Sequence, residues 1–313
     1  MNEVISVVVP MYYEEGVAQE CYRRLKKVMD DYNETYEFIF VNDGSTDKTM
    51  EILTHIAKED SQVKVLNLSR NFGHQNAVTA GLDYATGDAI VIIDADLQDP
   101  PELIPDLIAK WRAGDEVVYA KRKQRTGETF FKLITAKYFY RFLNQMTEIE
   151  IPKDTGDFRL IDRKVAEVFK KMPERNRFIR GMITWVGFKQ SFVEYNRDER
   201  FAGETKYPLK KMIKFALDGI FSFSSRPLKI INSIGLFAIL IAIGISIYSV
   251  AARLLGFGNV QLGWASMMVA IAFFGGMQLV ALGTIGAYIA RIYDESKNRP
   301  IYIVTETLNV VDD

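Results

Sequence analysis

The sequence predicts an α/β fold in which helices flank a twisted sheet, followed by two membrane-spanning helices. Three observations support this. Short runs rich in β-branched residues alternate with charged segments from residue 4 to residue 120. One strongly apolar run, residues 89–93, ends abruptly in acidic residues, and two long segments further along carry no charge. The first of these patterns is typical of a doubly wound sheet with right-handed crossovers.

The individual elements follow from the local pattern. Strands are predicted at 4–9, 36–41, 63–68, 89–93 and 116–120, and helices at 14–31, 48–58, 76–85 and 103–112. Between the second strand and the second helix, Asp43-Gly44 is a typical turn pair. Ser45 or Asp47 is suited to cap the helix that follows.

The stretch 89–100 is the part around which the rest is organised. Its apolar residues predict a central strand, and Pro100 prevents the strand from continuing. Carboxylates at the carboxyl end of such a strand lie where open α/β sheets bind ligands. Asp94 and Asp96 flank one small residue, so on an extended backbone both side chains leave the same face and can share one hard cation. The alternative is a solvated acidic turn, although the buried run directly before Asp94 would make an unpaired carboxylate costly there.

Composition excludes several classes of function. The 313 residues include 39 basic and 40 acidic ones, which gives a net charge of −1 and argues against a nucleic-acid protein that works by bulk charge. Cys21 is the single cysteine, so no internal disulfide can form. With only two histidines, a histidine-rich zinc site is not expected.

Two uncharged segments, 230–252 and 264–290, are each long enough to cross a hydrocarbon core of about 30 Å as a helix. Two buried core helices are the alternative. Basic residues precede the pair and follow it, whereas only Arg253 lies between them. The positive-inside rule therefore predicts that both ends of the chain are cytoplasmic and that the protein lies in the inner or plasma membrane. The amino terminus has no signal-peptide pattern, because Pro10 breaks its apolar run.

These features predict four consecutive parts. They are a catalytic domain at 1–205 with an interfacial helix at about 128–146, a juxtamembrane amphipathic helix at 206–228, two transmembrane helices within 229–291, and a cytoplasmic tail at 292–313. The interfacial and juxtamembrane segments mix aromatic and basic residues, which suits a membrane surface.

Several motifs lie along the predicted carboxyl edge of the sheet, in an order and spacing that is more specific than any of them alone. They are Pro10-x-Tyr12-x-Glu14, Asn42-Asp43-Gly44-Ser45-x-Asp47, Ser69-Arg70-Asn71-Phe72-Gly73 and Asp94-Ala95-Asp96-Leu97-Gln98-Asp99-Pro100. Together they resemble the family 2 glycosyltransferases, which have the GT-A fold, a Rossmann-like mixed sheet flanked by helices. The nearest resemblance is to the bacterial polyisoprenyl-phosphate glycosyltransferases, relatives of dolichol-phosphate mannose synthase. It continues through 154–160, 176–178 and 200–206, and it departs at Tyr13, where the family usually has asparagine.

The resemblance implies a nucleotide-sugar site. Asp94 and Asp96 would bind Mg²⁺ or Mn²⁺, with Gln98 beside the ion, and the ion would stabilise the leaving nucleoside diphosphate as a Lewis acid. Nucleotide contacts carried over from the family are Pro10, Tyr12, Glu14, Asp43 and Ala95. Tyr12 could lie on the face of the base and Asp43 could accept a base N–H. Arg200 and Lys206 suit cations that close over a diphosphate, although a basic loop near anionic lipid is the alternative.

The resemblance also implies an acceptor side. The family places a general base near Asp157 in enzymes that act on sugar alcohols, whereas a simple turn is the alternative. A phosphomonoester is mostly dianionic at neutral pH and needs no proton removed, so we expect Asp157 to orient donor or acceptor. Arg122 and Arg125 are predicted to hold the lipid phosphate, unless they belong to a solvated loop, and Arg159 could pair with Asp157 or with phosphate. For His74, a structural or exposed role is favoured over contact with the donor.

The predicted function is therefore metal-dependent, inverting transfer of one sugar from a nucleotide sugar to polyprenyl (undecaprenyl) phosphate, for glycosylation of the cell envelope. A UDP-sugar such as UDP-glucose or UDP-N-acetylglucosamine is the favoured donor, and a homo-oligomer is expected. One alternative is a processive polysaccharide synthase, which usually has more spans and a Gln-x-x-Arg-Trp motif absent from this sequence. The other is a catalytically idle sugar-nucleotide sensor or membrane scaffold.

Overall fold

A computed structural model describes residues 3–32, 35–123, 155–196, 224–255 and 263–310. The chain divides into two compact units, one built around a sheet and the other around two long helices. Several predictions fall outside the described residues: Arg125, Arg200, Lys206, the interfacial helix at 128–146 and most of the juxtamembrane helix at 206–228.

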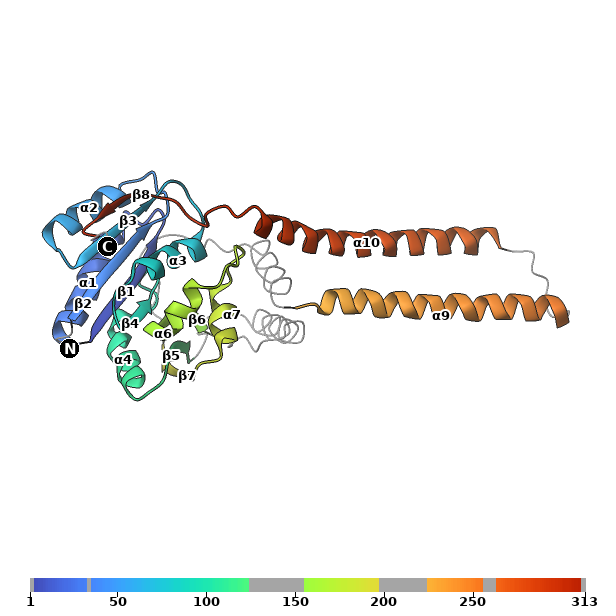
Figure 1. The fold of residues 1–313 in the computed structure, drawn as a ribbon, viewed down its shortest axis with the longest axis horizontal. Helices are drawn as coiled ribbons and strands as arrows, with labels where there is room; N and C mark the ends of the chain where they lie inside the picture. The colour runs from blue at the N-terminus through green and yellow to red at the C-terminus, as the bar shows by residue number, and fades with distance from the viewer. Residues whose placement is uncertain (1–2, 33–34, 124–154, 197–223, 256–262, 311–313) are drawn as a thin grey trace. The chain divides into compact units, whose positions relative to one another are not determined.

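The first unit contains an eight-stranded sheet with the order β7-β5-β6-β4-β1-β2-β3-β8 (Figure 1). The strands are β1 (Val4–Met11), β2 (Thr35–Asn42), β3 (Val63–Leu68), β4 (Ala89–Ile92), β5 (Val117–Arg122), β6 (Thr155–Asp162), β7 (Gln190–Tyr195) and β8 (Val304–Leu308). β6 and β8 run antiparallel to their neighbours, while β1 to β4 pair in parallel. The predicted mixed α/β sheet is confirmed.

Helices cover both faces of this sheet. They are α1 (Ala18–Tyr32), α2 (Thr49–Glu59), α3 (His74–Tyr84), the short 3₁₀ turn η1 (Pro101–Leu103), α4 (Ile104–Arg112), α6 (Arg163–Lys170) and α7 (Ile179–Val186). Alternate strand residues point to the same face of the sheet. On one face, Val7 and Val91 are buried in one hydrophobic cluster with Leu25 of α1 and Leu107 of α4. α3 packs on the opposite face, so closely that a Cβ on Gly81 would lie 2.2 Å from Val8 Cγ1. The sheet is therefore buried on both sides, as its continuous apolar strands require.

The antiparallel strand β6 brings a distant part of the chain next to β4. Ile92 of β4 is paired with Arg159 of β6, and the antiparallel register places Asp157 level with Asp94 beyond the end of β4. The chain segment that carries Asp157 therefore reaches the carboxyl edge of the sheet although it runs against the parallel strands.

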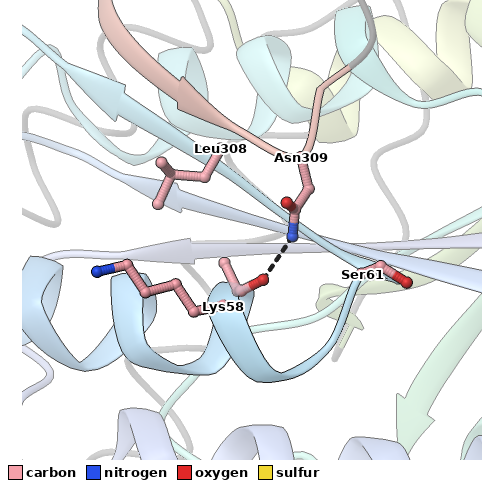
Figure 2. Close-up of a pocket in the computed structure, with 5 residues that line it drawn as sticks. Lys58, Ser61, Leu308 and Asn309 are labelled. Atoms are coloured by element: carbon pink, nitrogen blue, oxygen red, sulfur yellow. Dashed lines mark hydrogen bonds between the residues drawn. The ribbon is translucent and has the colours of Figure 1, made fainter.

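The eighth strand comes from the segment that was predicted to be a cytoplasmic tail. β8 lies antiparallel beside β3, with Leu66 opposite Thr307 and Val65 opposite Leu308. Directly after it, the Asn309 side chain donates hydrogen bonds to the carbonyl oxygens of Ala57 (2.6 Å) and Val63 (2.9 Å). Figure 2 shows this contact in a shallow pocket between α2 and the chain after β8. The chain after the long helices is thus part of the catalytic sheet.

The second unit contains the helices α9 (Arg226–Leu255) and α10 (Trp264–Ser296). Within them, Arg226–Ile245 and Phe273–Ser296 are long and apolar enough to cross a membrane, with mean hydropathies of 2.2 and 1.5. Neither segment is buried inside the protein, so the alternative of two core helices is not what the structure shows. These two apolar helices indicate association with a membrane.

Candidate active site

The candidate site lies at the carboxyl ends of β1, β2 and β4. β1 and β2 are paired up to Met11 and Asn42, and the Asp43 amide then donates to the Met11 carbonyl oxygen (2.9 Å). Pro10 lies within β1 itself, opposite Val41. Because parallel strands present their carboxyl ends at one edge, the motifs after these strands converge there.

The acidic motif after β4 turns sooner than the sequence predicts. β4 ends at Ile92, so Asp94 and Asp96 are not on an extended strand, and that expectation is wrong. Asp96 Oδ1 accepts a hydrogen bond from the Gln98 amide (3.1 Å), and Leu97 has a φ of 55°. A bulky residue rarely adopts this left-handed conformation, and such strain is concentrated at functional sites. Ala95 is buried in the core, which holds the turn in place.

Asp94 belongs to a group that the sequence did not predict as a whole. One ligand atom each from His74, Asp94 and Asp157 lie within 4.8 Å of one another. His74 Nε2 is 3.1 Å from Asp157 Oδ2 and 3.7 Å from Asp94 Oδ1. His74 opens α3, so the loop before that helix delivers the imidazole to the carboxylates. The His74 side chain is 39% exposed and pairs with Asp157, as the preference for a structural or exposed histidine predicts.

Both carboxylate oxygens of Asp157 form hydrogen bonds with basic side chains. Arg180, from the first turn of α7, donates from Nε to Oδ1 at 2.7 Å, while His74 contacts Oδ2. Arg159 Nη2 lies 3.6 Å from the same Oδ1. Arg159 is fully buried, donates to the Gly156 and Asp157 carbonyl oxygens and lies over the Tyr119 ring. Its Nη1 is buried without a hydrogen-bond partner among the described residues.

The charges in this group perturb one another. Desolvation and the neighbouring carboxylates Asp157, Asp99 and Asp96 raise the pKa of Asp94 to about 6, against the opposing charge of His74. Desolvation would lower the pKa of His74, but the hydrogen bond to Asp157 and the charge of Asp94 raise it to about 9. Although desolvation opposes it, the Arg180 charge holds the pKa of Asp157 well below its usual range.

Arg122 is the last residue of β5, which pairs with β6 on the side away from β4. Its Nε contacts the Tyr195 hydroxyl (3.3 Å) and its Nη2 lies 3.7 Å from Asp99 Oδ1, which also accepts a hydrogen bond from Tyr195. A Cβ on Gly156 would lie 3.0 Å from Arg122 Nη2. The absence of a side chain at position 156 thus lets this cation approach the residue next to Asp157.

Asp43 is buried and organises a loop. Its two oxygens accept hydrogen bonds from the amides of Phe72 (2.7 Å) and Gly73 (3.0 Å), directly before His74. Gly44 has a φ of 66°, and a Cβ there would lie 2.3 Å from the Arg70 carbonyl carbon. Each carboxylate oxygen of Asp43 has a further lone pair and could accept a second hydrogen bond. These two bonds therefore do not test the predicted role of Asp43 in binding a base.

The first motif lies beside this turn. Tyr12 is 39% exposed, as a platform for a ring requires, and its ring meets that of Tyr13 edge to face. Tyr13 has a φ of 56°, and its hydroxyl and amide contact Thr46 and Ser45. Among residues with a side chain, asparagine is one of those that adopt this conformation most easily, so a tyrosine here is unusual. The Glu14 carbonyl oxygen accepts the first hydrogen bonds that lead into α1.

The donor set fits a hard divalent cation. Carboxylate oxygens are the ligands that Mg²⁺ and Mn²⁺ prefer. The pKa of Asp94 is raised mainly by desolvation and further by the neighbouring carboxylates, and a bound cation would oppose both effects. Asp94 and Asp157 provide oxygens that could hold such an ion, whereas the raised pKa of His74 keeps its imidazole protonated at neutral pH, with no lone pair for a metal. Asp96 and Gln98, both half-buried, stay predicted ligands.

An α/β sheet that gathers carboxylates and arginines at its carboxyl edge has the architecture of a protein that binds a ligand at that edge. The family model for glycosyl transferase family 2 matches residues 6–169. The chain belongs to this family and is a glycosyltransferase.

Relatives extend over nearly the whole chain. An uncharacterized glycosyltransferase, YkcC of Bacillus subtilis, is 55% identical over 97% of this chain and 94% of its own length. The bactoprenol glucosyl transferase of Shigella phage SfV is 44% identical over 96% and 97%. Among solved structures, glucosyl-3-phosphoglycerate synthase of Mycobacterium tuberculosis with Mn²⁺, UDP and phosphoglyceric acid has a TM-score of 0.48 at 21% identity, covering 70% of this chain and 76% of that one.

Proposed function

We propose that the protein transfers one sugar, with inversion, from a nucleotide sugar to polyprenyl phosphate. The proposal rests on the group formed by His74, Asp94 and Asp157 at the edge of the sheet. The same chain also contains two apolar helices that are long enough to span a membrane. Relatives of this length that are named bactoprenol glucosyl transferases support a polyprenyl acceptor. UDP-glucose is the favoured donor.

On the donor side, Asp94 and Asp96 would hold Mg²⁺ or Mn²⁺, which when bound neutralises charge on the leaving diphosphate. Asp43 would shape the donor site through the loop before His74, because its carboxylate accepts hydrogen bonds from the Phe72 and Gly73 amides. The exposed ring of Tyr12 offers a stacking surface for a base. Pro10, Glu14, Ala95, Arg200 and Lys206 complete the proposed nucleotide contacts.

On the acceptor side, Asp157 would orient a substrate group and would not remove a proton. Both of its oxygens are engaged by cations, and its pKa lies well below its usual range. Such a carboxylate is a weak base at neutral pH, but a dianionic phosphate needs none. Arg122, with Arg125 and Arg159, would hold that phosphate in line with the donor sugar.

The membrane arrangement follows from the covalent path of the chain. β8 comes after α10 yet pairs with β3, which precedes α9, so a hairpin of two spans returns the chain to the side it left. Basic residues flank the hairpin, which favours the cytoplasmic side. The division at residues 205, 228 and 291 and a homo-oligomeric state stay predictions.

The test uses the purified full-length chain in detergent with undecaprenyl phosphate, Mg²⁺ or Mn²⁺, and UDP-glucose, UDP-N-acetylglucosamine or GDP-mannose. We expect a lipid-linked monosaccharide from one UDP-sugar, none without metal, and none from Asp94→Asn. Asp106→Asn, an exposed residue of α4, is the matched control and should keep full activity. A polymeric product would favour a processive synthase, and no product from any donor would contradict the proposal.

A further inference from the structure

The C-terminal strand touches the same loops that form the proposed donor site. The Ser69 amide, directly after β3, donates to the Ile303 carbonyl oxygen (2.9 Å), directly before β8. Ser69 opens the loop whose amides at Phe72 and Gly73 bind Asp43. The tail therefore fixes the start of this loop while Asp43 fixes its end.

A second line of hydrogen bonds starts from β8. The Thr305 hydroxyl donates to the Asn67 carbonyl oxygen (3.0 Å), and the Asn67 side chain accepts from Asn42 Nδ2 (2.8 Å). Asn42 Oδ1 in turn accepts from the Ser45 amide (3.2 Å), and the Ser45 hydroxyl accepts from the Tyr13 amide (3.1 Å). Consecutive bonds thus connect the tail with the turn after β2 and with the residue beside Tyr12.

The tail is anchored at two further points. Before β8, the Tyr302 hydroxyl donates to Asp83 Oδ2 (2.8 Å) near the end of α3, the helix that begins with His74. After β8, Asn309 donates to the carbonyl oxygens of Ala57, the bond drawn in Figure 2, and of Val63. Anchors on both sides of a short edge strand indicate that its position is specified, because an edge strand paired through its backbone alone is free to slip in register.

We propose that the segment 302–309 is a positioning element of the donor site, which holds the 69–73 loop and the 42–45 turn in their binding conformation. The role rests on the proposed function, since it concerns the nucleotide that these loops would bind. It assigns a part in donor binding to a chain segment that follows the membrane hairpin. Thr305 is its key side chain, because its hydroxyl begins the hydrogen-bond line toward Tyr13.

The experiment compares Thr305→Val with two controls in the full-length chain in detergent. Thr305→Ser keeps the hydroxyl, and Thr307→Val removes a hydroxyl from the same strand. Hydrogen–deuterium exchange of the peptides that cover 10–14, 42–46 and 69–73 reports on the loops, and titration with UDP and Mn²⁺ reports on the site. We expect Thr305→Val to exchange about two- to fivefold faster in these peptides and to bind UDP more weakly by a similar factor. Both controls should behave as the wild type does.

A stronger perturbation, truncation after Pro300, should abolish UDP binding and raise exchange along β3. Wild-type exchange in all three peptides of Thr305→Val would overturn the inference, as would faster exchange with unchanged UDP affinity. If the wild type bound no UDP, the favoured UDP-sugar donor would fail, while the exchange comparison would still decide whether the tail holds the loops.

Discussion

Replacing Arg180 by glutamine tests how Asp157 is held. The Arg180 Nε to Asp157 Oδ1 hydrogen bond is 2.7 Å long, and the two side chains are 25% and 13% exposed. A charge-assisted hydrogen bond of this kind contributes about 2 kcal/mol, which corresponds to about a thirtyfold change in rate if it acts on the transition state. We therefore expect Arg180→Gln to lower kcat about thirtyfold.

The assay is transfer of labelled sugar to undecaprenyl phosphate at saturating donor, with KM for the donor measured separately. A positioning role predicts that kcat falls while the donor KM stays within about twofold, because Asp43 and the 69–73 loop are untouched. Arg180→Lys keeps the charge without the planar geometry and should restore part of the rate. Arg23→Gln is the matched control, since Arg23 also pairs with a carboxylate but is 63% exposed. A kcat for Arg180→Gln within twofold of the wild type would refute the reasoning.

Three further predictions concern the sheet and its edge. Asp94→Asn should abolish the increase in Tm that Mn²⁺ and UDP together produce, because it removes the central carboxylate of the proposed ion site; an unchanged increase would place the ion elsewhere. Gly44→Ala should lower the free energy of unfolding by at least about 2 kcal/mol, measured by denaturation in detergent, since its φ is 66° and a Cβ would overlap the Arg70 backbone; a neutral effect would mean that the turn relaxes freely. Desolvation would raise the pKa of the Glu37 carboxyl, but its hydrogen bond and ion pair with Lys64 outweigh this and lower the pKa. The stability that ionised Glu37 contributes is therefore present above pH about 4.3, and it is lost as the pH falls through the folded-state pKa. Glu37→Gln should remove that part of the acid dependence of Tm, and identical slopes below pH 5 would contradict it.

The parts of the site that follow parallel strands could be predicted from the sequence. Asp94 comes directly after an apolar run and Asp43 follows one with only Asn42 between, and the rule that such ends share one edge of a sheet suffices to bring them together. Local signals also located the turn at Gly44. Of the two predicted caps, Ser45 and Asp47, the Asp47 carboxylate accepts from the Thr49 amide (3.1 Å), although the N-cap residue itself is Lys48.

The parts that depend on non-local pairing could not be predicted. His74 and Arg180 meet at Asp157 only because β6 inserts antiparallel between β4 and β5, and nothing near either residue encodes that register. β8 was missed for the same reason: five residues of ordinary polarity after a long helix carry little strand signal until β3 offers them a partner. The backbone of Leu97 bends where alternation alone predicts an extended chain, because strain of this kind is set by the surrounding packing.

The order of strands has a consequence for biosynthesis. β8 leaves the ribosome after both apolar helices, so until these helices have been made, β3 presents an unpaired backbone edge. A nascent chain that stalls within the hairpin would keep that edge available to other chains and to chaperones. The sheet is therefore completed only after both apolar helices have been synthesised, and a molecule that lacks the last strand keeps an open edge at β3.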